Sequence, residues 1–118
     1  MIQQDSNPVS RATIVGPGLL GASIGMALKD NAIAKEVWVY LRNQKKKEDC
    51  TKSNWCDHAV LELKAAVENS DLIILCTPVD IIIEQLAEIS KWIKPHCLVT
   101  DIGSLKNEIC RAADEIDA

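Results

Sequence analysis

Residues 12–25 read ATIVGPGLLGASIG, and this stretch indicates the fold of the chain. Residues 12–15 are a short apolar run of strand type. Residues 19–29 place apolar side chains every three or four positions, as one face of a helix does. Between the two segments lies Gly16-Pro17-Gly18-Leu19-Leu20-Gly21, a complete G-x-G-x-x-G. Four of the five glycines in the chain fall within positions 16–25, so the turn is built from residues that are scarce elsewhere.

The spacing of these glycines suits a turn that holds a diphosphate. Gly16 permits a tight exit from the strand, Gly18 lets the backbone approach a ligand without an intervening Cβ, and Gly21 lets the helix pack closely on the strand. The start of the helix then offers unpaired amides to an anion. The preceding strand and following helix supply the context that the dinucleotide motif requires. We therefore expect the cofactor to be bound by Gly16, Pro17, Gly18, Leu19, Leu20 and Gly21.

The remaining sequence alternates strand-length apolar runs with segments of helical period, which is typical of β-α-β units. Strands are expected at residues 12–15, 37–41, 72–76 and 97–102, with a short strand or turn within 55–60. Helices are expected at residues 19–29, 61–68 and 77–93 and from Ser104 onward, and the basic segment after residue 41 can be helical through Cys50. Thr77 is expected to cap the helix at 77–93, whose apolar stripe is Val79, Ile82, Ile83, Leu86, Ile89 and Ile93.

These elements predict an α/β fold, a Rossmann-type open parallel sheet with helices on both faces, in a single domain. A chain of 118 residues suits one domain. We assign residues 11–118 to this dinucleotide-binding domain and residues 1–10 to a flexible tail. The chain has no Phe, so its core must be aliphatic, as in a parallel sheet that is buried on both faces.

Composition narrows the functional classes. The net charge of −4 gives no overall attraction to nucleic acid or to an anionic membrane surface. No apolar run reaches the length of a membrane span. The five cysteines are odd in number and form no C-x-x-C pair, which favours a reduced protein in the cytoplasm. We find no metal-ligand cluster, and His58 and His96 lie in polar segments typical of surface histidines.

The second strand indicates which dinucleotide is bound. An NAD-binding fold places Asp or Glu about 20 residues after the glycines, where the carboxylate binds the ribose 2′-hydroxyl. Here that position falls at or near Leu41, followed by Arg42 and Asn43. A guanidinium binds a 2′-phosphate through two hydrogen bonds. We therefore predict NADP, with NAD possible, bound by Arg42 and Asn43, and we interpret Lys45, Lys46 and Lys47 as a solvated surface.

Two later strand ends complete the expected cleft, because ligands of open α/β sheets bind outside the carboxyl ends of the strands. The first supplies Cys76, Thr77, Pro78 and Val79. The second supplies Asp101 and Gly103, followed by Ser104.

Three blocks of this sequence, at residues 15–25, 75–79 and 100–106, together resemble the prephenate and arogenate dehydrogenases of tyrosine biosynthesis. The third block, Thr100-Asp101-Ile102-Gly103-Ser104-Leu105-Lys106, is the most specific. The resemblance covers the chain from about Arg11 to its end. It implies oxidative decarboxylation of prephenate or arogenate with hydride transfer to the nicotinamide, and it gives Ser104 a catalytic role in orienting a histidine and the substrate.

The same resemblance implies further parts that these residues do not include. The family's catalytic histidine lies in an H-P-x-A-G motif beyond G-S-x-K, and its C-terminal helical domain carries substrate contacts and the homodimer interface. We therefore expect the 118 residues to bind cofactor without turnover. Two alternatives stay open: the cofactor domain of a related dehydrogenase or imine reductase, and a non-catalytic module that senses nucleotides.

Overall fold

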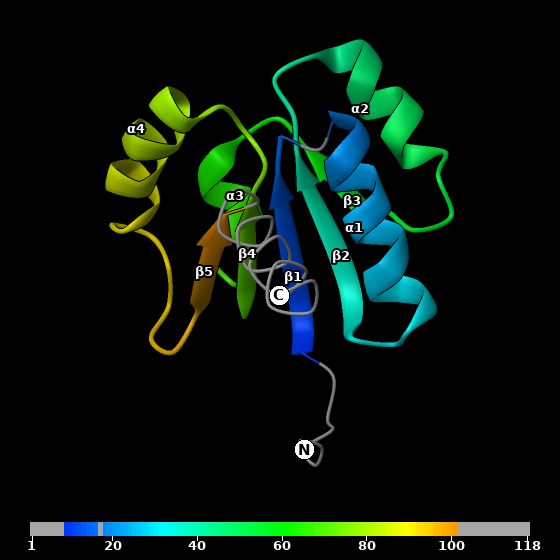
Figure 1. The fold of residues 1–118 in the computed structure, drawn as a ribbon, viewed down its shortest axis with the longest axis horizontal. Helices are drawn as coiled ribbons and strands as arrows, with labels where there is room; N and C mark the ends of the chain where they lie inside the picture. The colour runs from blue at the N-terminus through cyan, green and yellow to red at the C-terminus, as the bar shows by residue number, and fades with distance from the viewer. Residues whose placement is uncertain (1–8, 17, 102–118) are drawn as a thin grey trace, which may run out of the picture.

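The computed structural model describes residues 9–16 and 18–101. They form one parallel sheet in the order β3-β2-β1-β4-β5 (Figure 1). The strands are β1 (Val9–Val15), β2 (Ala34–Tyr40), β3 (His58–Val60), β4 (Leu72–Leu75) and β5 (Leu98–Asp101). The helices are α1 (Gly18–Asp30), α2 (Gln44–Thr51), α3 (Leu63–Val67) and α4 (Val79–Ile89). The strand order reverses between β1 and β4, which is the point where Rossmann-type sheets bind ligands.

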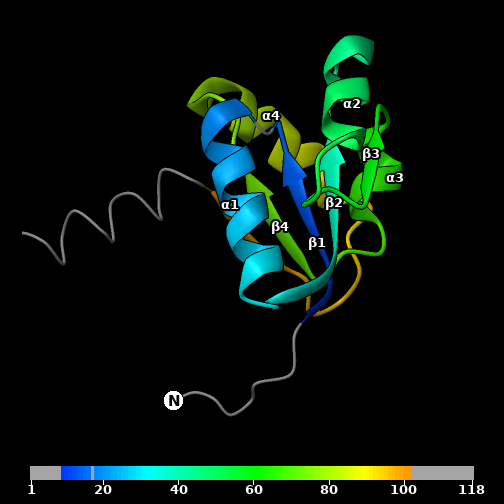
Figure 2. The same ribbon diagram turned by 90° about the vertical axis from the view of Figure 1, so that its right-hand side faces the viewer.

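Side chains alternate between the two faces of the sheet, so the core has two halves. Ile14 of β1 packs with residues from α1 and α2, whereas its neighbour Val15 packs with residues from α3 and α4. Figure 2 shows α1 and α3 on opposite sides of the strands. This arrangement confirms the predicted fold class of an open parallel sheet covered by helices on both faces.

The first two strands begin earlier than the sequence predicts. β1 starts at Val9, so Val9 and Ser10, which we expected in the flexible tail, belong to the sheet. Val9 pairs with Ala34, and β2 therefore starts three residues before the predicted Val37. Exposed Lys35 and Glu36 hide this extension in the sequence. The rest of the predicted tail and the helix predicted from Ser104 lie outside the described residues.

The helix after β4 also differs from its prediction. It ends at Ile89 instead of continuing to Ile93. Its buried face is Ile82, Gln85 and Ile89, whereas Ile83 and Leu86 are 67% and 42% exposed. The predicted apolar stripe was too wide, because its members span more of the helix than the sheet can cover. The side chains that turn inward are those of Ile82, Gln85 and Ile89, which follow one another at intervals of three and four residues.

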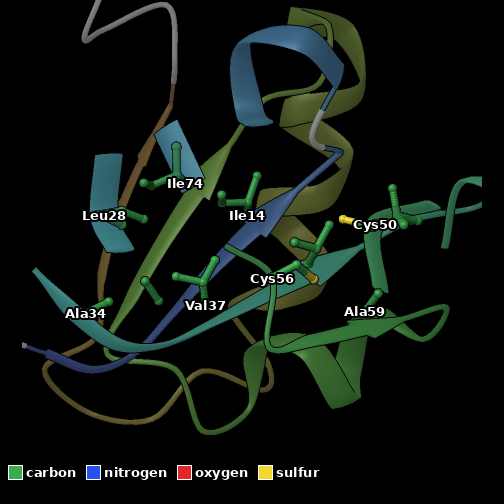
Figure 3. Close-up of a cluster of buried hydrophobic side chains, with 11 residues drawn as sticks. Ile14, Leu28, Ala34, Val37, Cys50, Cys56, Ala59 and Ile74 are labelled. Atoms are coloured by element: carbon green, nitrogen blue, oxygen red, sulfur yellow. The ribbon is translucent and has the colours of Figure 1, made fainter. Parts of the chain in front are cut away.

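The half of the core around α1 is closed by the segment between α2 and β3 (Figure 3). Cys50 and Cys56 both point their side chains into it and are buried. Gly25 of α1 faces Trp55 so closely that a Cβ on Gly25 would overlap the indole ring. Gly25 therefore serves contact with this connecting segment.

Candidate functional site

The carboxyl ends of β1, β2 and β4 meet around one cleft. Its volume is about 280 Å³, which is near the small end of the range for small-molecule sites. The cleft is lined by Gly16, Gly18, Tyr40, Leu41, Arg42, Asn43, Lys46, Cys76, Thr77, Pro78, Ile81 and Gln85. Residues that are far apart in the sequence thus converge at the reversal of strand order, as the position of the glycine motif predicts.

The glycine-rich turn forms one wall of the cleft. Gly16 and Gly18 have positive φ angles of 70° and 48°, a backbone conformation that favours glycine. The Gly16 amide donates to the Tyr40 carbonyl at 3.0 Å, which ties the end of β1 to the end of β2. A Cβ on Gly18 would meet no atom within 4 Å. The turn therefore leaves open space beside the first residue of α1, as binding of a diphosphate requires.

The end of β2 supplies the basic wall. Arg42 and Asn43 are exposed and line the cleft, as predicted. The Asn43 side-chain oxygen accepts hydrogen bonds from the amides of Lys45 and Lys46 at 2.8 and 3.1 Å, and so caps α2. This capping leaves the Asn43 amide group as a donor.

Lys46, which we interpreted with its neighbours as solvated surface, is exposed and also lines the cleft, four residues after Arg42. The two other lysines of the run are not among the lining residues. Leu41, which occupies the position of the expected acid, is 5% exposed and packs in the core.

The end of β4 supplies the third wall, with one correction. The N-cap of α4 is Pro78, and no side chain caps this helix. Thr77 instead donates its hydroxyl hydrogen to Gln85 Oε1 at 2.7 Å. The hydroxyl reaches along the helix to a buried amide acceptor, so it is not available to the first-turn amides that we expected it to cap. Beside it, burial raises the pKa of the Cys76 thiol to about 11.

Several predicted site residues fall outside this cleft or outside the description. Asp101 ends β5 opposite Leu75 and is not among the residues that line the cleft. Gly21 is buried in α1. Leu19, Leu20 and Val79 lie on α1 and α4, but their side chains are not described. Pro17, Gly103 and Ser104 lie outside the described residues. Tyr40, Lys46, Ile81 and Gln85 are lining residues that the sequence analysis missed.

The described residues also bear on the expectations for metal sites and histidines. Within residues 9–16 and 18–101, no group of His, Cys, Asp and Glu side chains could hold a metal ion. His58 and His96 are exposed, as predicted. Among the described helices, none is long and apolar enough to cross a membrane.

The strand order, the glycine turn and the cleft define the class: a nucleotide-binding α/β domain of Rossmann type. Comparison with protein families then gives the particular family. The nucleotide-binding domain of prephenate dehydrogenase matches residues 24–118, and the chain belongs to this family.

Individual relatives agree with this assignment. The chain is 28% identical over 109 residues to a prephenate dehydrogenase of Lactococcus lactis, covering 92% of this chain and 30% of that protein. It is 26% identical to a cyclohexadienyl dehydrogenase of Zymomonas mobilis over 102 residues, covering 86% and 35% respectively. The chain thus spans about a third of the length of these curated relatives.

Solved structures share the fold. Prephenate dehydrogenase from A. aeolicus, in complex with hydroxyphenyl propionate and NAD+, superposes with a TM-score of 0.73 at 20% identity, covering 81% of this chain and 34% of that one. The arogenate dehydrogenase of Synechocystis gives a TM-score of 0.71 at 27% identity, covering 78% and 32%. These superpositions confirm the fold. The family model matches residues that follow the glycine motif, so that match does not depend on the motif.

Proposed function

We propose that these residues form the NADP-binding domain of an enzyme that oxidises prephenate or arogenate. The observation that carries the proposal is the cleft at the ends of β1, β2 and β4. It combines an open glycine turn at Gly18 with a basic wall at Arg42. The relatives named as prephenate, cyclohexadienyl and arogenate dehydrogenases support the reaction class. When bound, the nicotinamide would accept the hydride from the substrate.

The residues of the cleft fit the parts of an NADP molecule. The glycine turn offers room for the diphosphate beside Gly18, where α1 begins and its first amides have no partner within the helix. Arg42 and Lys46 are cations on the wall that follows β2, and Leu41 stands where an acid would repel a 2′-phosphate. Such charge-assisted contacts contribute about 1.5–3 kcal/mol each. The basic wall therefore favours NADP over NAD.

The remaining parts of the proposal concern the longer protein. Ser104 would orient the substrate and a catalytic histidine supplied by later residues, and Asp101 and Gly103 would border the nicotinamide end of the site. The longer protein would be a homodimer. The described cysteines are all free thiols, which supports a cytoplasmic location.

Titration of NADP+ and NAD+ into the 118-residue chain tests the choice of cofactor. We expect tighter binding of NADP+, and we expect Arg42→Ala or Lys46→Ala to weaken NADP+ about tenfold or more while changing NAD+ little. Lys45→Ala is the matched control, because Lys45 belongs to the same basic run but does not line the cleft. Tighter binding of NAD+ by the unaltered chain would overturn the proposed specificity.

The reaction is tested with the longest natural chain that contains this sequence. We expect NADP-dependent oxidation of prephenate or arogenate, followed as NADPH absorbance. Failure to oxidise either substrate would overturn the proposed reaction while leaving the cofactor site to be judged by titration.

A further inference from the structure

Gln85 is a polar residue on the buried face of α4. It is 3% exposed and lies between Ile82 and Ile89, which are themselves buried. An amide at such a position destabilises the fold unless its polar atoms have partners. Leucine at this buried position would stabilise the packing of the helix more than glutamine does, which indicates that Gln85 has a role besides packing.

The hydrogen bonds of Gln85 are only partly accounted for within the described residues. Its Oε1 accepts from the Thr77 hydroxyl at 2.7 Å, which fixes the orientation of the side-chain amide. Its Nε2 has two hydrogens to donate and no recorded partner there. The only fully enclosed side-chain nitrogen or oxygen without a partner in the described chain is Arg11 Nε, so Nε2 keeps some accessible surface. Gln85 is a lining residue of the cleft, so the cleft is where a ligand could reach that surface.

The surroundings of Gln85 suit the base of a nucleotide. Ile81 lies one helical turn before Gln85 on α4 and also lines the cleft, as does Pro78 at the start of the helix. These apolar groups can cover the faces of a planar ring. The glycine turn and the basic wall of Arg42 and Lys46 provide for the phosphates, so the apolar portion beside α4 is left for the base.

We propose that Gln85 Nε2 donates a hydrogen bond to ring nitrogen N1 of adenine and thereby selects adenine dinucleotides, with Thr77 as the positioning residue. The inference rests on the proposed dinucleotide function and adds base recognition to it. Adenine N1 is an acceptor, whereas N1 of hypoxanthine carries a hydrogen. Because Thr77 fixes Nε2 as the group that faces the base, Nε2 can donate to N1 of adenine. With hypoxanthine, two donors would face each other and binding would be weaker.

Comparison of NADP+ with nicotinamide hypoxanthine dinucleotide phosphate tests the proposal. The two ligands differ only at the base, and binding is read by calorimetry without any reaction. We expect the unaltered chain to bind NADP+ at least about fivefold more tightly, which corresponds to one neutral hydrogen bond. Equal binding of the two ligands would overturn the role of Gln85 while leaving the proposed function intact. Binding of neither ligand would instead overturn the proposed function.

Two variants test the residues themselves. In Gln85→Glu, one carboxylate oxygen still accepts from Thr77 and the other becomes an acceptor, so the preference should reverse in favour of hypoxanthine. In Thr77→Val, the amide is free to turn over, so the two ligands should bind within about twofold of each other. Thermal unfolding identifies a variant that fails to fold. In that case Gln85→Leu, which gives α4 an apolar buried face, is used instead. We expect this variant to bind the adenine and hypoxanthine ligands equally. Retention of the adenine preference in a folded Gln85→Leu chain would contradict the proposal.

Discussion

The methyl carbon of Thr77 lies where a side chain on Gly16 would have to be placed: a Cβ built on Gly16 comes within 2.5 Å of Thr77 Cγ2. The turn after β1 and the turn after β4 are therefore packed directly against each other. Gly16 meets two demands at once, a φ of 70° and this contact with Thr77. Gly18, with a φ of 48° and no neighbour in the way, meets only the first demand.

Alanine at the two glycines should consequently have different effects. Gly16→Ala adds both backbone strain and overpacking, and we expect it to lower the free energy of unfolding by about 2–4 kcal/mol. Gly18→Ala adds strain alone, about 1–2 kcal/mol, but its methyl group occupies the space of the diphosphate, so cofactor binding should be lost. Urea denaturation and NADP+ titration of both variants separate the effects. Equal losses of stability would contradict the close packing of the two turns.

Gly25 and Trp55 give a second test, in which two effects oppose each other. Alanine in a helix interior is favoured over glycine by about 1 kcal/mol. A Cβ on Gly25 would overlap the Trp55 ring, and such overpacking costs about 1–3 kcal/mol. We expect overpacking to prevail, so Gly25→Ala should be destabilised in urea. Trp55→Leu should lower the free energy of unfolding less in the Gly25→Ala variant than it does in the unaltered chain. Strict additivity would show that the two residues are not in contact.

Asp71 predicts how stability changes at acidic pH. Its carboxylate pairs with Lys94 at 2.7 Å and accepts the Arg11 amide hydrogen at 3.0 Å. The Lys94 contact is the larger cause, and together they lower the pKa of Asp71. A lowered pKa stabilises the fold above the unfolded pKa of about 3.9, and that contribution is lost as the pH falls further.

Asp71→Asn should therefore destabilise the chain by about 1–2 kcal/mol at pH 7. The difference from the unaltered chain should shrink as the pH falls below about 4. Urea denaturation at pH 7 and pH 3 measures both values. A difference that stays constant across this range would show that the ionised carboxylate is not what stabilises the fold.

Cys76 gives a chemical test of the cleft. Because burial raises its thiol pKa to about 11, little thiolate exists at pH 8, and thiolate is the form that reacts with iodoacetamide. We expect slow alkylation of Cys76 at pH 8 and faster reaction as the pH approaches 11, measured by mass spectrometry of its peptide. Bound NADP+ should slow it further. Fast labelling at pH 8, equal to that of the urea-unfolded chain, would contradict the burial of this thiol.

The sequence predicted the parts of the site that depend on local pattern. Gly16, Arg42, Asn43 and Thr77 each lie within three residues of the end of a strand, and parallel strands bring their carboxyl ends to one edge of the sheet. Lys46 was not assigned to the cleft, because its place there depends on where the helix capped by Asn43 begins. A run of three lysines gives no sign of which one lines the cleft.

Gln85 was missed although the sequence held a signal. It lies three residues after Ile82 and four before Ile89, so a polar residue interrupts the apolar face. The prediction that Thr77 caps the helix was wrong, because the hydroxyl of Thr77 bonds to Gln85, eight residues away. Contacts of that length depend on the path of the chain after Pro78, which local pattern does not specify.

Binding of a dinucleotide in this cleft can be observed residue by residue, by titrating the isotopically labelled chain with NADP+ and following amide chemical shifts in NMR spectra. We expect the largest shifts on Gly16, Gly18, Arg42 and Thr77. The amides of Lys29 and Lys52, which line a separate groove near the far end of α1, should stay in place. Shifts centred on that groove, or no shifts at saturating cofactor, would contradict the claim that this cleft binds a dinucleotide.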